Sequence, residues 1–74
     1  MCTFIFRYTD GTTDNYEGII QAQYDKPSGT VTVSESELLE HRFPLSYNMW
    51  LKSKEASFLV SSKNLRNIEV RIEA

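Results

Sequence analysis

Apolar side chains recur at every second position in several short stretches of this chain. Residues 68–73 read IEVRIE, and residues 2–9 read CTFIFRYT, with apolar side chains at alternate positions. Residues 30–34 (TVTVS) and 56–61 (ASFLVS) follow the same rule over shorter lengths. Because successive side chains of a β-strand point to opposite faces, an interval of two predicts strands.

Turn residues separate these stretches and predict hairpins between them. Asp10-Gly11 follows the first stretch, and residues 25–29 (DKPSG) are the clearest turn signal in the chain. Between these turns, residues 16–24 predict another strand. Gly18 falls inside it and indicates a bulge or a sharp bend, since glycine weakens a flat strand.

Residues 34–42 allow two interpretations. Ser34 and Glu37 have the spacing of a capping box, and acidic residues suit the first turn of a helix. These signals favour one or two helical turns over residues 35–41. The alternation that begins at Leu39 favours a strand instead, so the sequence leaves helix and strand open here.

The alternation continues to Leu51 and predicts a strand over residues 45–51. Pro44 cannot donate a hydrogen bond to a strand ladder, so we place a break at Phe43-Pro44. On this strand Leu45, Tyr47, Met49 and Leu51 would share one face and Trp50 would lie on the other.

Five or six short strands joined by turns are typical of small all-β proteins. We expect a mainly β fold, either a small antiparallel, partly open barrel of the SH3-like kind or a sandwich. It would have five to six strands and at most one short helix near residues 35–41. The chain of 74 residues predicts a single small β domain over residues 1–74.

The shortness of the chain limits its core. A chain of this size buries only about 60% of its unfolded surface. With one cysteine and one histidine, it can form neither an internal disulfide nor a closed four-ligand zinc site. Good packing or self-association must stabilise it instead, and we favour a homo-oligomer.

The sequence shows no targeting or membrane-spanning segment. Its apolar runs are too short for a secretion signal or for the roughly 20 residues of a membrane span. An unpaired cysteine fits a reducing compartment. We expect a cytoplasmic protein without a membrane partner, and the small size favours a bacterial, phage or other mobile-element setting.

Few groups in the chain could perform catalysis. His41 has only Glu40 beside it, and adjacent residues do not face each other on a strand or a helix. Cys2 has no cationic neighbour in the sequence to activate its thiol. The acidic residues match no calcium loop, and the three glycines form no phosphate-binding loop. We therefore expect a non-catalytic protein with no cofactor and no metal.

The charge of the chain is unevenly spread along it. Residues 1–41 carry two basic and seven acidic side chains, a net −5, whereas residues 42–74 carry six and three, a net +3. Charged halves can steer association, but strands from both halves can also interleave and cancel the difference. We favour interleaving.

Nucleic-acid binding is the alternative function that the sequence leaves open. Small barrels bind single strands by stacking bases on aromatic side chains in a basic groove. The sequence pI of about 5.2 lies below the basic values usual for such domains, which disfavours this alternative. Its surface would comprise Trp50, Lys52, Lys54, Lys63 and Arg66.

Protein–protein interaction is the function that we favour, with another protein or a second copy of this chain as the partner. Tryptophan and other aromatic residues are enriched at the energetic centres of interfaces. By alternation, Trp50, Ile19 and Leu59 point away from the main apolar face. Either they form an exposed patch that binds a partner, or the monomer buries both faces. The candidate interface residues are Trp50, Tyr47, Ile19 and Leu59.

Overall fold

The computed structural model describes residues 1–73 and confirms the mainly β fold. Six antiparallel strands form one sheet that does not close, as in a partly open barrel or sandwich. The elements are β1 (Cys2–Tyr8), β2 (Thr13–Lys26), β3 (Gly29–Ser34), the 3₁₀ turn η1 (Glu35–Glu37), β4 (Met49–Ser53), β5 (Ser57–Val60) and β6 (Leu65–Ile72).

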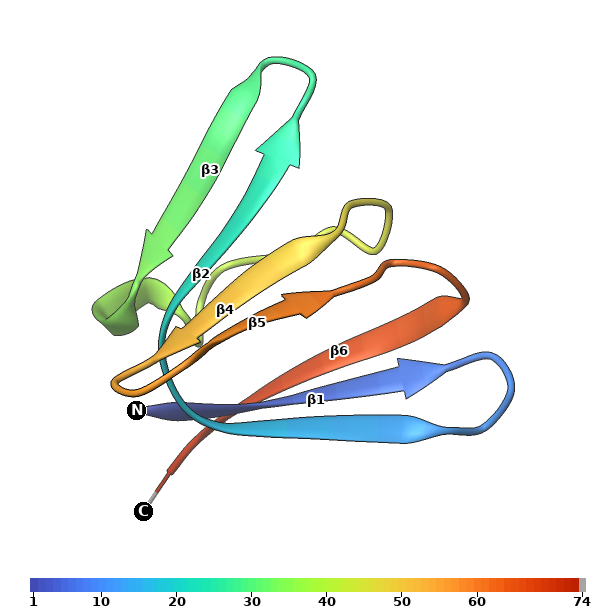
Figure 1. The fold of residues 1–74 in the computed structure, drawn as a ribbon, viewed down its shortest axis with the longest axis horizontal. Helices are drawn as coiled ribbons and strands as arrows, with labels where there is room; N and C mark the ends of the chain where they lie inside the picture. Colours follow the sequence, from blue (N-terminus) through green and yellow to red (C-terminus); the bar gives the residue numbers. More distant parts are fainter. Residues whose placement is uncertain (74) are drawn as a thin grey trace.

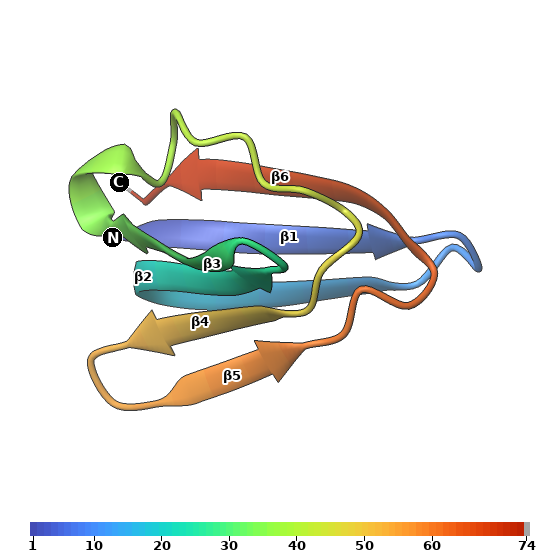
Figure 2. The ribbon, with the colours of Figure 1, turned by 90° about the horizontal axis from the view of Figure 1, so that it is seen from above.

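The strands follow the spatial order β5-β4-β2-β1-β6, and β3 also pairs with β2 (Figures 1 and 2). The strands β1 and β2 of the acidic half of the chain therefore lie between strands of its basic half, with β4 and β5 on one side and β6 on the other. β6 pairs with β1, and β4 pairs with β2. Strands from the two halves thus interleave in the sheet, as predicted, with the acidic-half strands flanked by basic-half strands.

The long strand β2 belongs to both halves of the sheet. Its first part, to Ile19, pairs with β1, and its second part, from Gln21, lies between β3 and β4. Figure 1 shows β2 curving upward between these two parts. Gly18 has a positive φ of 69°, and the register with β1 shifts beside it, which confirms the predicted bulge.

The curvature of β2 lets the two halves of the sheet enclose a core. Phe4 and Phe6 of β1 are fully buried and stack with ring centroids 6.1 Å apart. Burying such a side chain is worth roughly 1.5–3 kcal/mol. The buried core cluster comprises Cys2, Phe4, Phe6, Ile19, Ala22, Val33, Leu38, Met49, Leu51 and Val60.

The segment between η1 and β4 is irregular, so the predicted strand over residues 45–51 was wrong in its first half. β4 begins only at Met49. The segment instead packs aromatic rings over the core: Phe43 lies edge-on to Phe4 at 5.3 Å, and Tyr47 stacks on Tyr24 at 6.3 Å. Of the helical turns favoured over residues 35–41, only the 3₁₀ turn η1 forms. Ser34 Oγ donates a hydrogen bond to the Glu37 carboxylate and accepts none from a backbone N–H of this turn.

The expected position of Ile19 was also wrong. Ile19 is fully buried in the core, although strict alternation puts it on the outer face. The register shifts twice around it, once against β1 near Gly18 and once against β4 between Ile19 and Gln21. Each irregularity moves the following side chains to the opposite face, because the side-chain period of a strand is two. Ile19 therefore cannot contribute to a surface.

Candidate functional site

Trp50 and Leu59 form an exposed apolar pair on the outer face of β4 and β5. Their side chains are 46% and 55% exposed, whereas Met49, Leu51 and Val60 of the same strands are buried. Trp50 and Leu59 lie directly opposite in the register. The Ser53 N–H donates to the Ala56 carbonyl, so by alternation the Trp50–Leu59 pair is a non-hydrogen-bonded one, in which side chains approach most closely.

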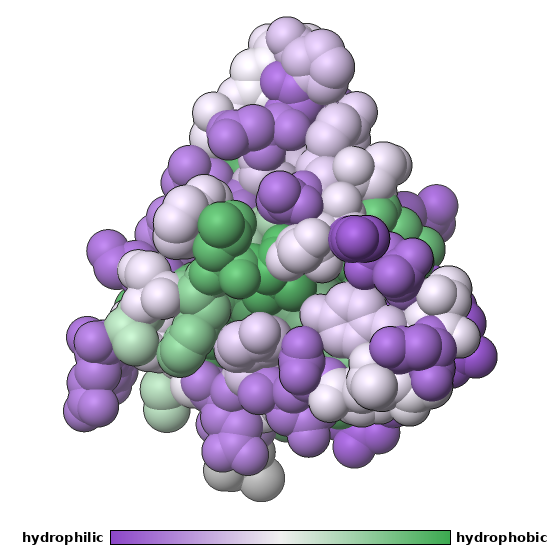
Figure 3. Space-filling model, turned by 45° about the vertical axis from the view of Figure 1, so that its right-hand side comes forward, coloured by the Kyte–Doolittle hydropathy of each residue, from purple (hydrophilic) through white to green (hydrophobic). Residues whose placement is uncertain are grey.

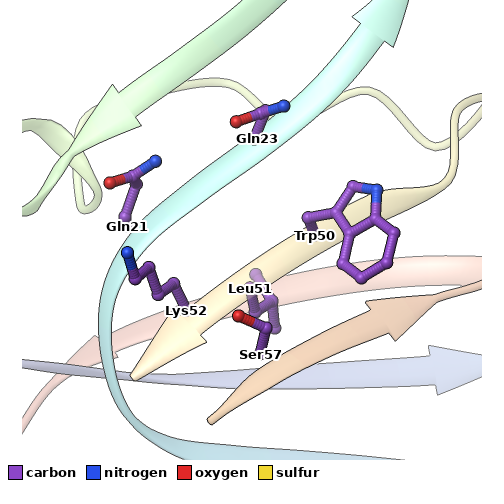
Figure 4. Close-up of a pocket in the computed structure, with 6 residues that line it drawn as sticks. All are labelled: Gln21, Gln23, Trp50, Leu51, Lys52 and Ser57. Atoms are coloured by element: carbon purple, nitrogen blue, oxygen red, sulfur yellow. The ribbon is translucent and has the colours of Figure 1, made fainter. Parts of the chain in front are cut away.

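A shallow hollow adjoins Trp50 on the side of β2, and we call it the Trp50 hollow. Gln21 and Gln23 of β2, Trp50, Leu51 and Lys52 of β4, and Ser57 of β5 line it. Figure 4 shows the two glutamines standing along β2, the Lys52 amine reaching toward them and the indole lying over β4. The hollow thus offers amide groups, one cation and one aromatic surface side by side.

Trp50 also borders a second hollow, which we call the Tyr47 hollow. Asp25, Ser46, Tyr47, Asn48, Trp50, Leu59 and Ser62 line it. Asn48 Oδ1 accepts the Ser62 N–H at 2.9 Å and joins the segment before β4 to the one after β5. Trp50 and Tyr47 therefore share one surface, with Leu59 as its outermost apolar side chain.

Three of the four predicted interface residues come together at this surface: Trp50, Tyr47 and Leu59. We call these three residues the Trp50 surface. The fourth, Ile19, lies in the core. Seen in space-filling form, one side of the molecule has apolar residues gathered near its middle and polar residues around them (Figure 3).

The predicted nucleic-acid residues are less well gathered. Lys52 lines the Trp50 hollow beside the indole. Lys54 lines a different hollow together with Glu17, Glu55 and Glu73. Lys63 and Arg66 line neither the Trp50 hollow nor the Tyr47 hollow. One lysine, rather than four basic residues, accompanies the exposed tryptophan.

Sequence reasoning did not single out Gln21 and Gln23 as part of the site. Alternation along residues 16–24 puts both on the face opposite Tyr16 and Tyr24, and Gln23 lies directly opposite Trp50 in the register between β2 and β4. The sequence pattern alone does not indicate that β2 pairs with β4, because these strands are not consecutive in the chain. A register prediction for β2 and β4 would have brought the glutamines to the tryptophan.

His41 and Cys2 both pack against other residues of the fold. His41 Nε2 lies 2.8 Å from the Tyr24 hydroxyl, and its ring packs on Phe43 at 4.7 Å. Cys2 is a buried free thiol of the core, and burial raises its pKa above the usual value. Within residues 1–73, no three His, Cys, Asp or Glu side chains are grouped so that they could hold a metal ion.

None of the helical segments in those same residues has both the length and the apolar character that a membrane-spanning helix needs. No protein-family model, no curated protein sequence and no solved structure matches this chain.

Proposed function

We propose that this protein is a non-catalytic binding module that docks a segment of another protein on the Trp50 surface. The observation that carries the proposal is the exposed Trp50–Leu59 pair, which the monomer leaves outside its core. A tryptophan costs little side-chain entropy when it is immobilised, and it buries a large area, so it is a frequent energetic centre of interfaces.

The free edge of β5 suggests the form of the docked segment. Among the strands of residues 1–73, β5 pairs only with β4, and the register directs the backbone groups of Ser57 and Leu59 away from β4. An extended peptide added here would pair with those groups and set alternate side chains against Trp50 and Leu59. Lys52 favours a carboxylate on the same peptide. We place this activity in the cytoplasm, which fits the unpaired Cys2.

Selection from a random peptide library tests this proposal directly. We expect enriched peptides with an apolar anchor residue near an Asp or Glu. Trp50→Ala should weaken their affinity at least about tenfold, as for an interface centre. Ile72→Ala is the matched control, because Ile72 is an exposed apolar residue of a different strand. Peptides that bind the Trp50→Ala variant as well as the native chain, or a selection without enrichment, would contradict the proposal.

Single-stranded nucleic acid is a second candidate, favoured by one observation. Lys52 stands beside the exposed indole in the Trp50 hollow, an arrangement that suits a stacked base and its phosphate. Titration of tryptophan fluorescence with a single-stranded oligonucleotide at low salt tests it. Quenching that disappears at moderate salt would support this candidate, and unchanged fluorescence at low salt would eliminate it.

A further inference from the structure

β6 lies at an edge of the sheet. β6 pairs with β1 on one side, and no other strand of residues 1–73 pairs with it. Figure 2 shows β6 at one margin of the sheet, with the segment after η1 passing over it. β6 has eight residues without a proline or a lysine, whereas the edge strand β5 has four residues. β6 therefore offers a longer row of unpaired backbone groups than β5.

The register assigns the free backbone groups of this edge. The Glu73 N–H donates to the Met1 carbonyl at 3.1 Å, so the hydrogen-bonded pairs with β1 continue through Arg71 and Glu69. The N–H and C=O groups of Ile68, Val70 and Ile72 consequently point away from β1. Such a row of unpaired groups is a template for another strand.

Exposed apolar side chains gather around the same edge. Ile72 is 66% exposed, and Leu39 and Leu45 of the segment after η1 are 51% and 41% exposed. Leu39 and Leu45 line a hollow with Ile68 and Val70 of β6, and Leu39 lines another with Ile72. A strand added at this edge would cover apolar surface that the monomer leaves in water.

We propose that β6 pairs antiparallel with β6 of a second copy of this chain, about a twofold axis at Val70. In this register Glu69 lies opposite Arg71 of the second copy, and Ile68 lies opposite Ile72 of the second copy. Each chain contributes both partners, so the charge pair and the apolar pair each occur twice. All apolar side chains of the paired strands then share one face, and the charged side chains share the other.

The charges of β6 select this register over its neighbours. An axis at Glu69 would place two glutamates opposite each other, and an axis at Arg71 would place two arginines opposite each other. A shift of one residue would set apolar side chains against charged ones and turn one apolar row to the wrong face. Glu69 is already held on the charged face by Arg7 at 2.8 Å and by Arg71 of its own chain.

Reciprocal charge reversal tests both the dimer and its register. We expect the native chain to show a concentration-dependent dimer in sedimentation equilibrium. Arg71→Glu sets Glu opposite Glu, and Glu69→Arg sets Arg opposite Arg, so each variant alone should dimerise roughly tenfold more weakly. An equimolar mixture of the two variants should recover the dimer, because both charge pairs are then complementary.

Three further variants distinguish pairing through β6 from non-specific effects of charge, from loss of folding and from binding at the Trp50 surface. Lys63→Glu makes the same charge change as Arg71→Glu on an exposed residue outside β6, and it should leave the dimer intact. Val70→Pro removes the N–H that points away from β1, and circular dichroism should show a folded chain that no longer dimerises. Trp50→Ala should also leave the dimer intact, which separates this proposal from the peptide-binding one.

Any one of three results would overturn the proposal. The first is a native chain that sediments as one copy from micromolar to millimolar concentration. The second is a mixture of the two charge variants that stays monomeric. The third is a Lys63→Glu variant that weakens the dimer as much as Arg71→Glu.

Discussion

Leu51 and Leu59 are leucines on the neighbouring strands β4 and β5, yet one is buried and the other is exposed. Leu51 is fully buried in the core, and Leu59 is 55% exposed beside Trp50. Burial rather than residue type decides what a truncation costs, because a buried leucine leaves a cavity and an exposed one does not. We therefore expect Leu51 to stabilise the fold and Leu59 to be available for binding.

Truncation of each leucine to alanine measures that difference. We expect Leu51→Ala to lower the free energy of unfolding by about 2–5 kcal/mol, the range for buried leucines. Leu59→Ala should change it by less than about 0.5 kcal/mol, as is usual for surface substitutions. Urea denaturation followed by circular dichroism gives both values. Equal losses for the two variants would place Leu59 in the core and contradict the structure.

The Tyr8 hydroxyl donates to Asp14 Oδ2 at 3.1 Å. Burial of the ring, together with this hydrogen bond, raises the pKa of Tyr8 from 10.0 to about 12. The folded chain therefore holds the phenolic proton more tightly than the unfolded chain. The resulting stability is complete below pH 10 and is lost as the pH rises toward 12.

Tyr8→Phe tests this dependence on pH. The variant should lose at most about 1 kcal/mol at neutral pH, because the hydrogen bond is exposed. As the pH rises through the alkaline range, the free energy of unfolding of the variant should fall less steeply than that of the native chain, because the variant lacks the tyrosine whose pKa folding raises. Denaturation at a series of pH values provides the measurement, with tyrosinate absorbance as a check. An unchanged alkaline slope would refute the assignment to Tyr8.

At the scale of elements, β2 sets the shape of the molecule. Its bulge depends on Gly18, whose φ of 69° is favourable for glycine and strained for other residues. The Gly18 N–H donates to Glu73 Oε2 at 2.7 Å, which fixes the bulge to the segment after β6. Apart from Gly18 and its two chain neighbours, no residue of the described part of the chain has an atom within 4 Å of the position that a Cβ would occupy there, so we expect a substitution to act through the backbone.

Gly18→Ala should therefore destabilise the fold by about 1–2 kcal/mol, the cost of the left-handed conformation. Gly18→Asn is the matched control, because asparagine tolerates this conformation better, and it should lose less. Thermal unfolding of the two variants gives the comparison. An asparagine variant that is less stable than the alanine variant would argue against backbone strain as the cause.

Alternation along single strands predicted most of the elements from the sequence. It placed β1 and β3 within a residue or two and Trp50 on the outer face of its strand, and Gly18 marked the bulge. It did not place Ile19, because the two register shifts depend on pairing with both β1 and β4. Residues 45–48 were missed because Tyr47 packs on Tyr24 instead of joining a ladder, a tertiary contact that no local pattern encodes.

At the scale of the whole molecule, the candidate surfaces lie toward the two ends of the open sheet. The Trp50 surface lies at the β4–β5 end, and the free edge of β6 lies at the other end. Within residues 1–73, β3, β5 and β6 each pair with one strand only, so the open sheet leaves more than one free edge, and a small protein must protect or use such edges. We propose different uses for the two ends, a docked peptide at one and a second copy of the chain at the other.

We propose that Trp50 serves binding rather than stability. Denaturation experiments on the native chain and on Trp50→Ala, each with and without a selected peptide, test this proposal. Circular dichroism follows the unfolding in each case. A ligand that binds only the folded state raises the free energy of unfolding by RT ln(1 + [L]/Kd). We predict nearly equal stabilities without peptide, and stabilisation by peptide in the native chain alone. A Trp50→Ala variant that is strongly destabilised yet still stabilised by the peptide would contradict the claim.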